Sequence, residues 1–395
     1  MMKVLQKMTA LFLCLLMLVV FAACNGGEEN SIPVSSGEIS SKEVSSVGEP
    51  VSELFSAGVD PDVPLQTDDD PYLTVPKATG DFIQSWLCAG WTKNKWDSYF
   101  ATIKQAGYEF VIVQCTFGIE DGRFNMLLFE NDISDDKTLC TETVQLYTDC
   151  LGNALEAAKN NGMQVMIGLG SDDEWWGGAV DPEWRKKQAE MNNLAIKEIV
   201  NHYFDTYEEQ IFGWYWTYEM WTQGRHLEDG WAEMYNMTRT YAANLTPGLP
   251  MMVCPYYSAW ENLPGDQVGE MWGRFFQKVE FEEGDIFCPQ DGFGTQGRPL
   301  DWVEGIWLDT KKAMETYAPE AEFWLDVENF CDGGKSADVA RYTKQLDICA
   351  RIGEGLVSFS YVHYYDPGSK SGKYHKAYLA YLETIKDLEI VSEEA

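Results

Sequence analysis

The sequence predicts the α/β fold class, with a single (β/α)8 or TIM barrel as the folded part. Beyond residue 80, eight short apolar segments rich in β-branched and aromatic residues alternate with amphipathic helical segments. This alternation is typical of parallel βαβ units, and eight units within residues 76–390 fit the length of a closed barrel. A doubly wound open sheet is the alternative, but no glycine-rich dinucleotide turn follows the first strand.

The first 24 residues are predicted to be a lipoprotein signal peptide. Lys3 and Lys7 precede the apolar run 11–20, and small residues lead to Cys24. This run is too short for a comfortable membrane span. Its end, FAAC, resembles the bacterial lipobox, which implies cleavage before Cys24, lipidation of its thiol and anchoring to the outer face of a bacterial membrane. The alternative is an ordinary signal peptide with Cys24 unmodified.

Residues 25–75 are predicted to be a flexible acidic linker. The segment is rich in Ser, Gly, Pro and acidic residues, and Lys42 is its one basic residue. Such a composition buries too little apolar surface to offset the entropy lost on ordering. We expect the linker to hold the barrel away from the membrane.

The domain of residues 76–390 is expected to form its eight strands in chain order. Helices are expected between them, for example at 95–107, 143–162 and 182–204, where Gly107 and Gly162 suit the left-handed residue that closes many helices. The expected strands lie within 81–86, 109–115, 164–170, 211–219, 250–257, 285–291, 322–328 and 355–365.

Glu219 and Glu328 are expected at the C-terminal ends of the fourth and seventh strands, where the active sites of such barrels lie. Because side chains alternate along a strand, Glu219 shares a face with Tyr215, and Glu328 shares a face with Trp324 and Asp326. The opposite faces are more apolar and suit the helix layer. Both glutamates are therefore predicted to point toward the barrel axis.

Two carboxylates across a barrel mouth suit the cleavage of a glycosidic bond, because one donates a proton to the leaving oxygen and the other attacks or activates water. Their placement resembles that in the glycoside hydrolases of clan A. The resemblance implies Glu219 as acid/base, Glu328 as nucleophile and retention of configuration. That clan usually has Asn before the first glutamate, where this chain has Tyr218.

Asp291 is a third candidate catalytic residue, since it ends the sixth strand before a glycine-rich turn. It could orient the substrate or replace Glu328 as the partner of Glu219. Alternatively, its carboxylate stabilises its own turn.

Motifs along nearly the whole domain resemble a bacterial family called domain of unknown function 4434. That family is similar to (β/α)8-barrel glycoside hydrolases, so the resemblance implies the barrel fold. The motifs are FIQ at 82–84, VIVQ at 111–114, GWYWTYE at 213–219, CPQDGFG at 288–294 and VHYYDP at 362–367.

Nine further residues near strand ends are candidates for substrate binding. Amides can hydrogen-bond to sugar hydroxyls, and flat aromatic rings can stack on the C–H face of a sugar. Each has a structural alternative, because glutamines can satisfy each other inside a barrel and rings can pack in loops. The candidates are Gln84, Trp86, Gln114, Trp175, Tyr215, Tyr256, Gln290, His363 and Tyr364.

Composition limits the partners. A net charge of -34 argues against nucleic acid and anionic lipid as partners of the folded part. The chain has only four histidines, and no cysteine pair has metal-ligand spacing with them, so neither a metal nor another cofactor is expected. No protein partner follows from the sequence.

Two functions of different class are predicted. The first is a surface-anchored glycoside hydrolase that cleaves a polysaccharide or oligosaccharide with a Glu/Glu pair. The alternative is a non-catalytic glycan-binding lipoprotein with the same barrel, since a barrel can lose its chemistry and keep its cleft. In both cases the partner is a carbohydrate, and Cys24 links the protein to the membrane.

Overall fold

The computed structural model describes residues 71–177, 181–221, 228–257, 265–296, 300–331, 334–368, 370 and 372–388. The predicted signal peptide, its lipidation site Cys24 and the linker as far as residue 70 lie outside these residues. No helix in the described ranges is long and apolar enough to cross a membrane.

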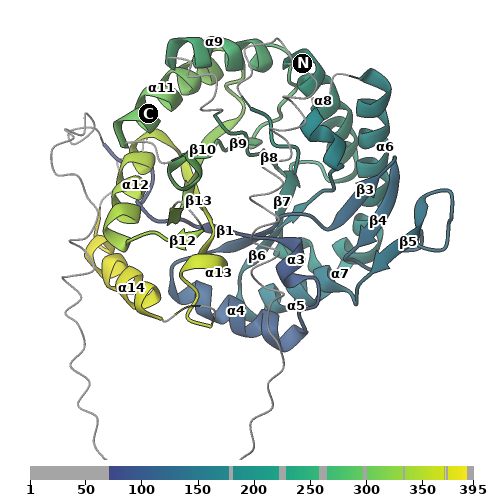
Figure 1. Cartoon of the computed structure of the whole chain (residues 1–395), viewed down its shortest axis with the longest axis horizontal. Coiled ribbons are helices and arrows are strands. Elements are labelled where there is room, and N and C mark those ends of the chain that lie inside the picture. Colours follow the sequence, from purple (N-terminus) through teal and green to yellow (C-terminus); the bar gives the residue numbers. More distant parts are fainter. Residues whose placement is uncertain are drawn as a thin grey trace, which may run out of the picture.

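Eight parallel strands form a closed barrel, as predicted (Figure 1). Each pairs with its neighbour in chain order, and the ring closes where the first strand pairs with the last, Gly80 opposite Val357. The strands are β1 (Gly80–Ile83), β2 (Phe110–Val113), β6 (Gln164–Gly168), β7 (Ile211–Trp216), β8 (Met251–Val253), β9 (Ile286–Phe287), β10 (Glu322–Glu328) and β13 (Gly355–Phe359).

Helices surround this ring on its outside (Figure 1). Several begin at a residue whose side chain accepts a hydrogen bond from the first turn, such as Thr92 and Asp181, and the predicted Gly162 closes its helix in the left-handed conformation. The main helices are α4 (Lys93–Gln105), α5 (Cys150–Asn161), α6 (Pro182–Ile199), α8 (Glu228–Leu245), α9 (Gly265–Phe276), α11 (Leu300–Tyr317), α12 (Val339–Ile352) and α14 (Lys373–Ile385).

Short elements occupy the connections after the strands. After β1 comes α3 (Ser85–Cys88), after β6 the 3-10 turn η1 (Asp173–Gly177), after β9 α10 (Phe293–Gln296), and after β13 α13 (Tyr361–Tyr364). Between α6 and β7 the chain forms the π-helical turn η2 (Val200–Phe204), α7 (Asp205–Tyr207) and η3 (Glu208–Gln210). A small hairpin, β11 (Phe330–Cys331) and β12 (Lys335–Ser336), follows β10.

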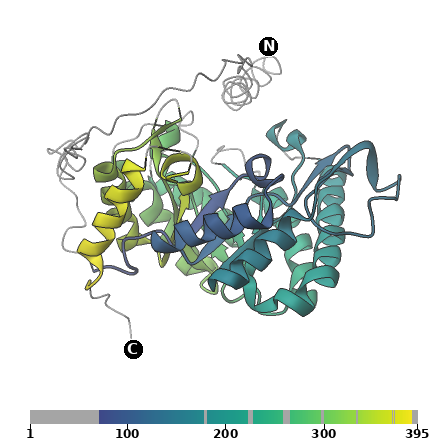
Figure 2. The same ribbon diagram turned by 90° about the horizontal axis from the view of Figure 1, so that it is seen from below.

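A three-stranded sheet, which the sequence did not predict, lies beside the barrel (Figures 1 and 2). It is formed by the part of the chain that follows β2 and precedes α5. Its strands are β3 (Phe117–Glu120), β4 (Arg123–Leu127) and β5 (Cys140–Leu146). The helix expected from residue 143 was therefore too long, because pairing with β4 holds its first residues as a strand. The helix begins only after Asp149, whose side chain caps it.

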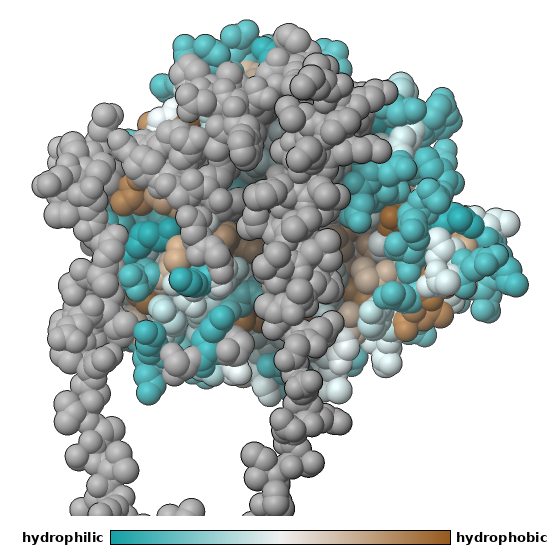
Figure 3. All heavy atoms as spheres, viewed as in Figure 1, coloured by the Kyte–Doolittle hydropathy of each residue, from teal (hydrophilic) through white to brown (hydrophobic). Residues whose placement is uncertain are grey.

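Two apolar layers follow from the alternation along the strands. Alternate strand residues such as Phe82, Met166, Tyr215 and Trp324 fill the barrel interior, while those between them form the larger core against the helices. Hydrophilic residues cover most of the visible rim on the side of α6 and the three-stranded sheet (Figure 3).

The segment before β1 packs against α12. The backbone amides of Leu73 and Thr74 both donate to the carbonyl oxygen of Ala350, and the Tyr72 ring lies 3.9 Å below the Arg351 guanidinium. Contacts with the barrel therefore begin a few residues inside the segment that the sequence assigns to the linker.

Candidate active site

Glu219 follows β7 at the C-terminal end of the barrel. Its backbone carbonyl accepts a hydrogen bond from Trp175 Nε1 at 2.8 Å. Burial in the surrounding protein raises the pKa of its carboxyl group to about 7, the nearby Glu328 carboxylate adds to the rise, and a hydrogen bond from the Gln290 side chain opposes it. Glu219 is thus a carboxyl group able to hold a proton near neutral pH.

Glu328 ends β10 and is only 2% exposed. Its backbone is held on both sides: its amide donates to Asp291 Oδ1 at 3.3 Å, and its carbonyl accepts from Gln345 Nε2 at 3.1 Å and from Arg341. The Glu328 charge contributes to the raised pKa of Glu219, so the carboxyl groups of the two predicted catalytic glutamates lie close enough to interact electrostatically.

Asp326 joins these acids, although the sequence singled it out only as sharing a face with Glu328. Burial and the charges of Glu328 and Asp291 raise its pKa well above the ordinary value, while a hydrogen bond from the Cys254 thiol opposes the rise. Its Oδ1 is buried without a hydrogen-bond partner among the residues that the structure describes. The spacing of two residues along one strand was the signal that could have identified it.

Asp291 lies behind Glu328 and is fully buried. It accepts hydrogen bonds from Gln345 Nε2 at 2.7 Å, from the Phe293 amide at 3.2 Å and from the Glu328 amide. Burial and the Glu328 charge raise its pKa to about 8. Both carboxylate oxygens of Asp291 thus accept hydrogen bonds from protein groups. This geometry fits the alternative that Asp291 stabilises its own turn, and it adds a role in positioning Glu328. It fits a role as a third catalytic acid less well.

Gln345 and Arg341, both on α12, are functional candidates that the sequence analysis missed. Gln345 bridges Asp291 and the Glu328 carbonyl, and the Arg341 guanidinium lowers the pKa of Asp291 against its overall rise. The sequence pattern of α12 does not distinguish either residue from the others on the helix. Whether a helix residue reaches the mouth depends on how the helix packs against the strands, which the sequence pattern does not show.

Trp175 does not line the mouth, contrary to the prediction that it binds substrate. It is 2% exposed and packs among aromatic residues, with its ring 5.1 Å from Tyr218 and 6.1 Å from Trp216. The 3-10 turn η1 folds it under the backbone of Glu219. Tyr218 points toward α6, where its hydroxyl donates to Gln188 Oε1 at 2.8 Å, so the residue that departs from the clan A pattern is turned away from the acids.

Tyr256 and two tryptophans form an aromatic stack beside Glu219. Trp176 stacks on Trp221 at 6.0 Å, and Trp221 stacks on Tyr256 at 6.1 Å. Burial raises the pKa of the Tyr256 hydroxyl, and the nearby Glu219 charge adds to the rise. Trp176, rather than the predicted Trp175, therefore belongs to the aromatic stack next to Glu219.

A second aromatic group lies beside Glu328. Tyr364 stacks on Phe330 at 5.1 Å, and burial together with the Glu328 charge raises the pKa of its hydroxyl to about 12. His363 stacks on Trp86, which is 51% exposed, and burial lowers the histidine pKa to about 4, so its ring is neutral. Its buried Nε2 has no hydrogen-bond partner within the described part of the chain.

The remaining candidates lie at different depths. Tyr215 is 2% exposed and sits in the barrel interior, edge-on to Phe82 at 5.2 Å, so it forms the floor below the acids. Gln84 and Gln114 are half-buried at the ends of β1 and β2. Their positions continue the inward faces of Phe82 and Ile112.

Fold and site together define a (β/α)8-barrel protein with a group of buried carboxylates at the C-terminal end of its strands. The chain belongs to the family described as "Domain of unknown function (DUF4434)", which matches residues 78–371. No curated protein matches the chain significantly.

Similar solved structures support the same fold. A Bacteroides thetaiotaomicron protein described as a candidate alpha-L-fucosidase superposes with a TM-score of 0.60 and 19% identity, over 84% of this chain and 98% of that one. An endo-1,4-beta-D-mannanase from Thermotoga petrophila gives a TM-score of 0.53 and 12% identity, over 78% and 99%. At these identities the likeness is one of fold.

Proposed function

We propose that the protein is a retaining glycoside hydrolase, with Glu219 as acid/base and Glu328 as nucleophile. The observation that carries this proposal is the raised pKa of Glu219 beside a second glutamate that lies at the end of the seventh barrel strand. One carboxyl group that holds its proton near neutral pH beside another acid is the combination needed for glycosidic cleavage.

The two glutamates act in sequence. Glu219 donates its proton to the leaving oxygen as Glu328 attacks the anomeric carbon, which gives a glycosyl ester of Glu328 and a free alcohol. Esterification removes the Glu328 charge, which is one cause of the raised Glu219 pKa. The pKa of Glu219 then falls, so its carboxylate can accept a proton from water as the water breaks the ester.

Aromatic groups on both sides of the acids suit a carbohydrate substrate. The stack of Trp176, Trp221 and Tyr256 lies beside Glu219, and the Tyr364 and Phe330 pair lies beside Glu328. Flat rings of this kind can pack on sugar C–H faces, while the amides of Gln84, Gln114 and Gln290 can hydrogen-bond hydroxyls.

The test compares Glu219→Gln and Glu328→Gln on aryl glycosides and oligosaccharides. Loss of the acid should lower turnover of oligosaccharides at least about a hundredfold, yet spare the first step on aryl glycosides whose leaving groups need no proton. Loss of the nucleophile should abolish both. Glu383→Gln, an exposed acid on α14, is the control. Unchanged activity in either mouth variant contradicts the assignment.

We also propose that the protein is anchored by a lipid at Cys24 on the outer face of a bacterial membrane. The lipobox-like sequence FAAC supports this. Cys24→Ala should move the protein from the membrane fraction to the soluble one and end its labelling with radioactive palmitate. Retention of the label in the variant contradicts the site.

The second candidate function is glycan binding without catalysis, which the aromatic stack beside Glu219 favours by itself. Calorimetry with oligosaccharides decides between the two. Binding without turnover, with affinity kept in Glu328→Gln, would support the binding protein and exclude the hydrolase.

A further inference from the structure

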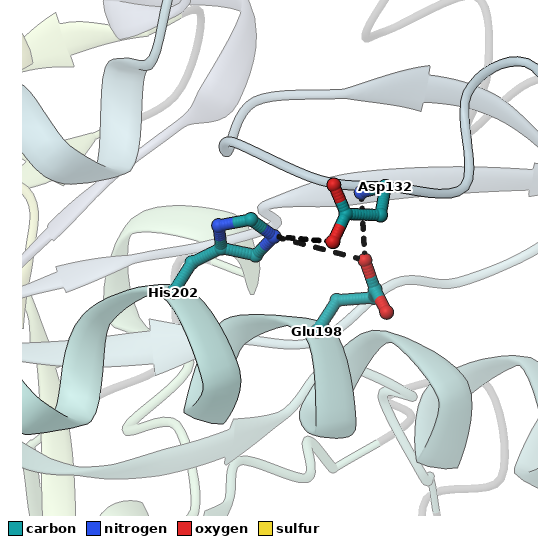
Figure 4. A group of neighbouring side chains, drawn as sticks. All are labelled: Asp132, Glu198 and His202. Carbon is teal, nitrogen blue, oxygen red and sulfur yellow. Dashed lines mark hydrogen bonds and ion pairs between the residues drawn. The ribbon is translucent and has the colours of Figure 1, made fainter.

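Three potential metal ligands meet on the outside of the barrel, away from the carboxylates of the mouth. Asp132 lies in the loop between β4 and β5, Glu198 in the last turn of α6, and His202 in the π-helical turn η2. All three point toward one another (Figure 4). Their nearest ligand atoms lie within 4.8 Å of one another.

The separations fit the edges of a metal coordination shell. His202 Nε2 lies 3.6 Å from Asp132 Oδ2 and 3.9 Å from Glu198 Oε2. Ligand atoms that each lie about 2.1 Å from a tetrahedral ion are roughly 3.4 Å from one another. A small movement of the three side chains toward one another would therefore give the separations of a coordination shell. Both distances exceed that of a hydrogen bond.

His202 Nε2 provides an independent observation. The atom is buried and points between the two carboxylates, with which it makes only long ion-pair contacts, and no group among the described residues forms a hydrogen bond with it. A buried polar atom without a partner is costly. A bound ion would satisfy it, and Asp132, whose side chain is 87% exposed, leaves one side open for a water ligand.

The backbone holds this arrangement in place. The Asp132 amide donates to Glu198 Oε2 at 2.8 Å, and the Glu130 amide donates to the Tyr203 hydroxyl at 2.6 Å. The π-helical turn thus presents His202 and Tyr203 to the same loop, and such turns are frequent at functional sites. The ligands come from segments 66 residues apart, which explains why sequence spacing gave no sign of them.

We propose that Asp132, Glu198 and His202 bind a divalent transition metal ion, with Zn²⁺ as the best match to one imidazole and two carboxylates. The ion ties the β4–β5 loop to the end of α6. The site contributes to stability and lies apart from the proposed hydrolytic acids, so it does not depend on the proposed function.

The test measures Zn²⁺ binding to the full chain by calorimetry after treatment with a chelator. We expect one ion per chain and a higher Tm with Zn²⁺. Asp132→Ala and His202→Asn should each weaken binding at least about tenfold, and their Tm should no longer respond to Zn²⁺. Asp132 is exposed, so its variant should keep the Tm of the chelated parent protein. Asp135→Ala, an exposed acid in the same loop, is the control and should bind normally.

Two results would overturn the proposal. One is the absence of Zn²⁺ binding by the parent chain. The other is equal affinity in Asp132→Ala, His202→Asn and the control, which would mean adventitious binding elsewhere. Tighter binding of Ca²⁺ than of Zn²⁺ would contradict the choice of ion, because a hard cation prefers an all-oxygen shell.

Discussion

Trp175 Nε1 donates a hydrogen bond to the backbone carbonyl oxygen of Glu219 at 2.8 Å. Trp175 is itself fixed by the rings of Tyr218, Trp216 and Trp184. A rigid aromatic layer therefore determines where the backbone of Glu219 lies, one residue beyond the point at which Tyr218 turns toward α6. The position of the proposed proton donor depends on packing outside the barrel interior.

Trp175→Phe tests this relationship by keeping a ring and removing the N–H group. We expect kcat to fall about tenfold with KM almost unchanged, because a displacement of the acid affects the chemical step more than binding. Steady-state kinetics provide the measurement. Trp96→Phe is a matched control, since the Trp96 Nε1 is buried but has no hydrogen-bond partner in the described ranges. Equal kinetics in parent and Trp175→Phe would show that packing alone positions Glu219.

The pH profile of kcat/KM should report the proton on Glu219. Because its pKa lies at about 7, the acid is protonated below this pH, and activity should fall about tenfold per pH unit above it. In Glu219→Gln this alkaline limb of the pH profile, the decline in activity above about pH 7, should disappear with aryl substrates. A limb that persists in that variant would assign the titration to another group.

Gln290→Ala should move the same limb to higher pH. The Gln290 side chain donates a hydrogen bond that lowers the pKa of Glu219, so its loss should raise that pKa by about 0.5 to 1 unit, equivalent to one modest hydrogen bond. Gln164→Ala, at the opposite end of the barrel on β6, serves as the control. A shift to lower pH would contradict the hydrogen bond.

Stability should fall as pH rises between about 4 and 8. The pKa of Asp291 is about 8 in the folded chain against an ordinary value of 3.8, so the folded protein binds more protons than the unfolded chain in this range and loses stability on deprotonation. The contribution is fully present below pH 3.8 and lost by pH 8. Thermal unfolding at pH 5 and pH 8 measures it, and Asp291→Asn should flatten the difference. A higher Tm at pH 8 than at pH 5 would contradict the sign.

Arg239→Met should destabilise the fold by about 3 to 5 kcal/mol. Arg239 is 1% exposed, and its Nε donates to Asp285 Oδ2 at 2.7 Å. Asp285 also accepts from the Met251 amide and the Tyr235 hydroxyl, so it joins α8 to β8. Removal of the guanidinium leaves a buried carboxylate without its charge partner. Urea denaturation gives the change, with Arg274→Met, which is more exposed, as a milder comparison.

The barrel was predictable from the alternation of eight strand segments with helical segments, and the inward direction of Glu219 and Glu328 was expected from the period of two along strands. The sequence did not predict the three-stranded sheet, since β5 forms only by pairing with β4. Trp175 was assigned to the wrong place because a tryptophan in a loop can turn outward or inward, and neighbouring rings decide which. Asp291 could have faced the mouth or its own turn, and Gln345 on α12 fixes its direction.

The sequence by itself determined the eight parallel strands, the helix layer and the end of the barrel at which the acids lie, because alternation and chain order are local properties. Only the tertiary structure decided which polar atoms meet. Burial raises the pKa of Glu219, α12 supplies Gln345 and Arg341 behind Glu328, and a loop and a helix bring Asp132 to Glu198 and His202. These contacts join residues far apart in the chain. Their energies depend on how completely the packed protein excludes water from them, which no local sequence pattern determines.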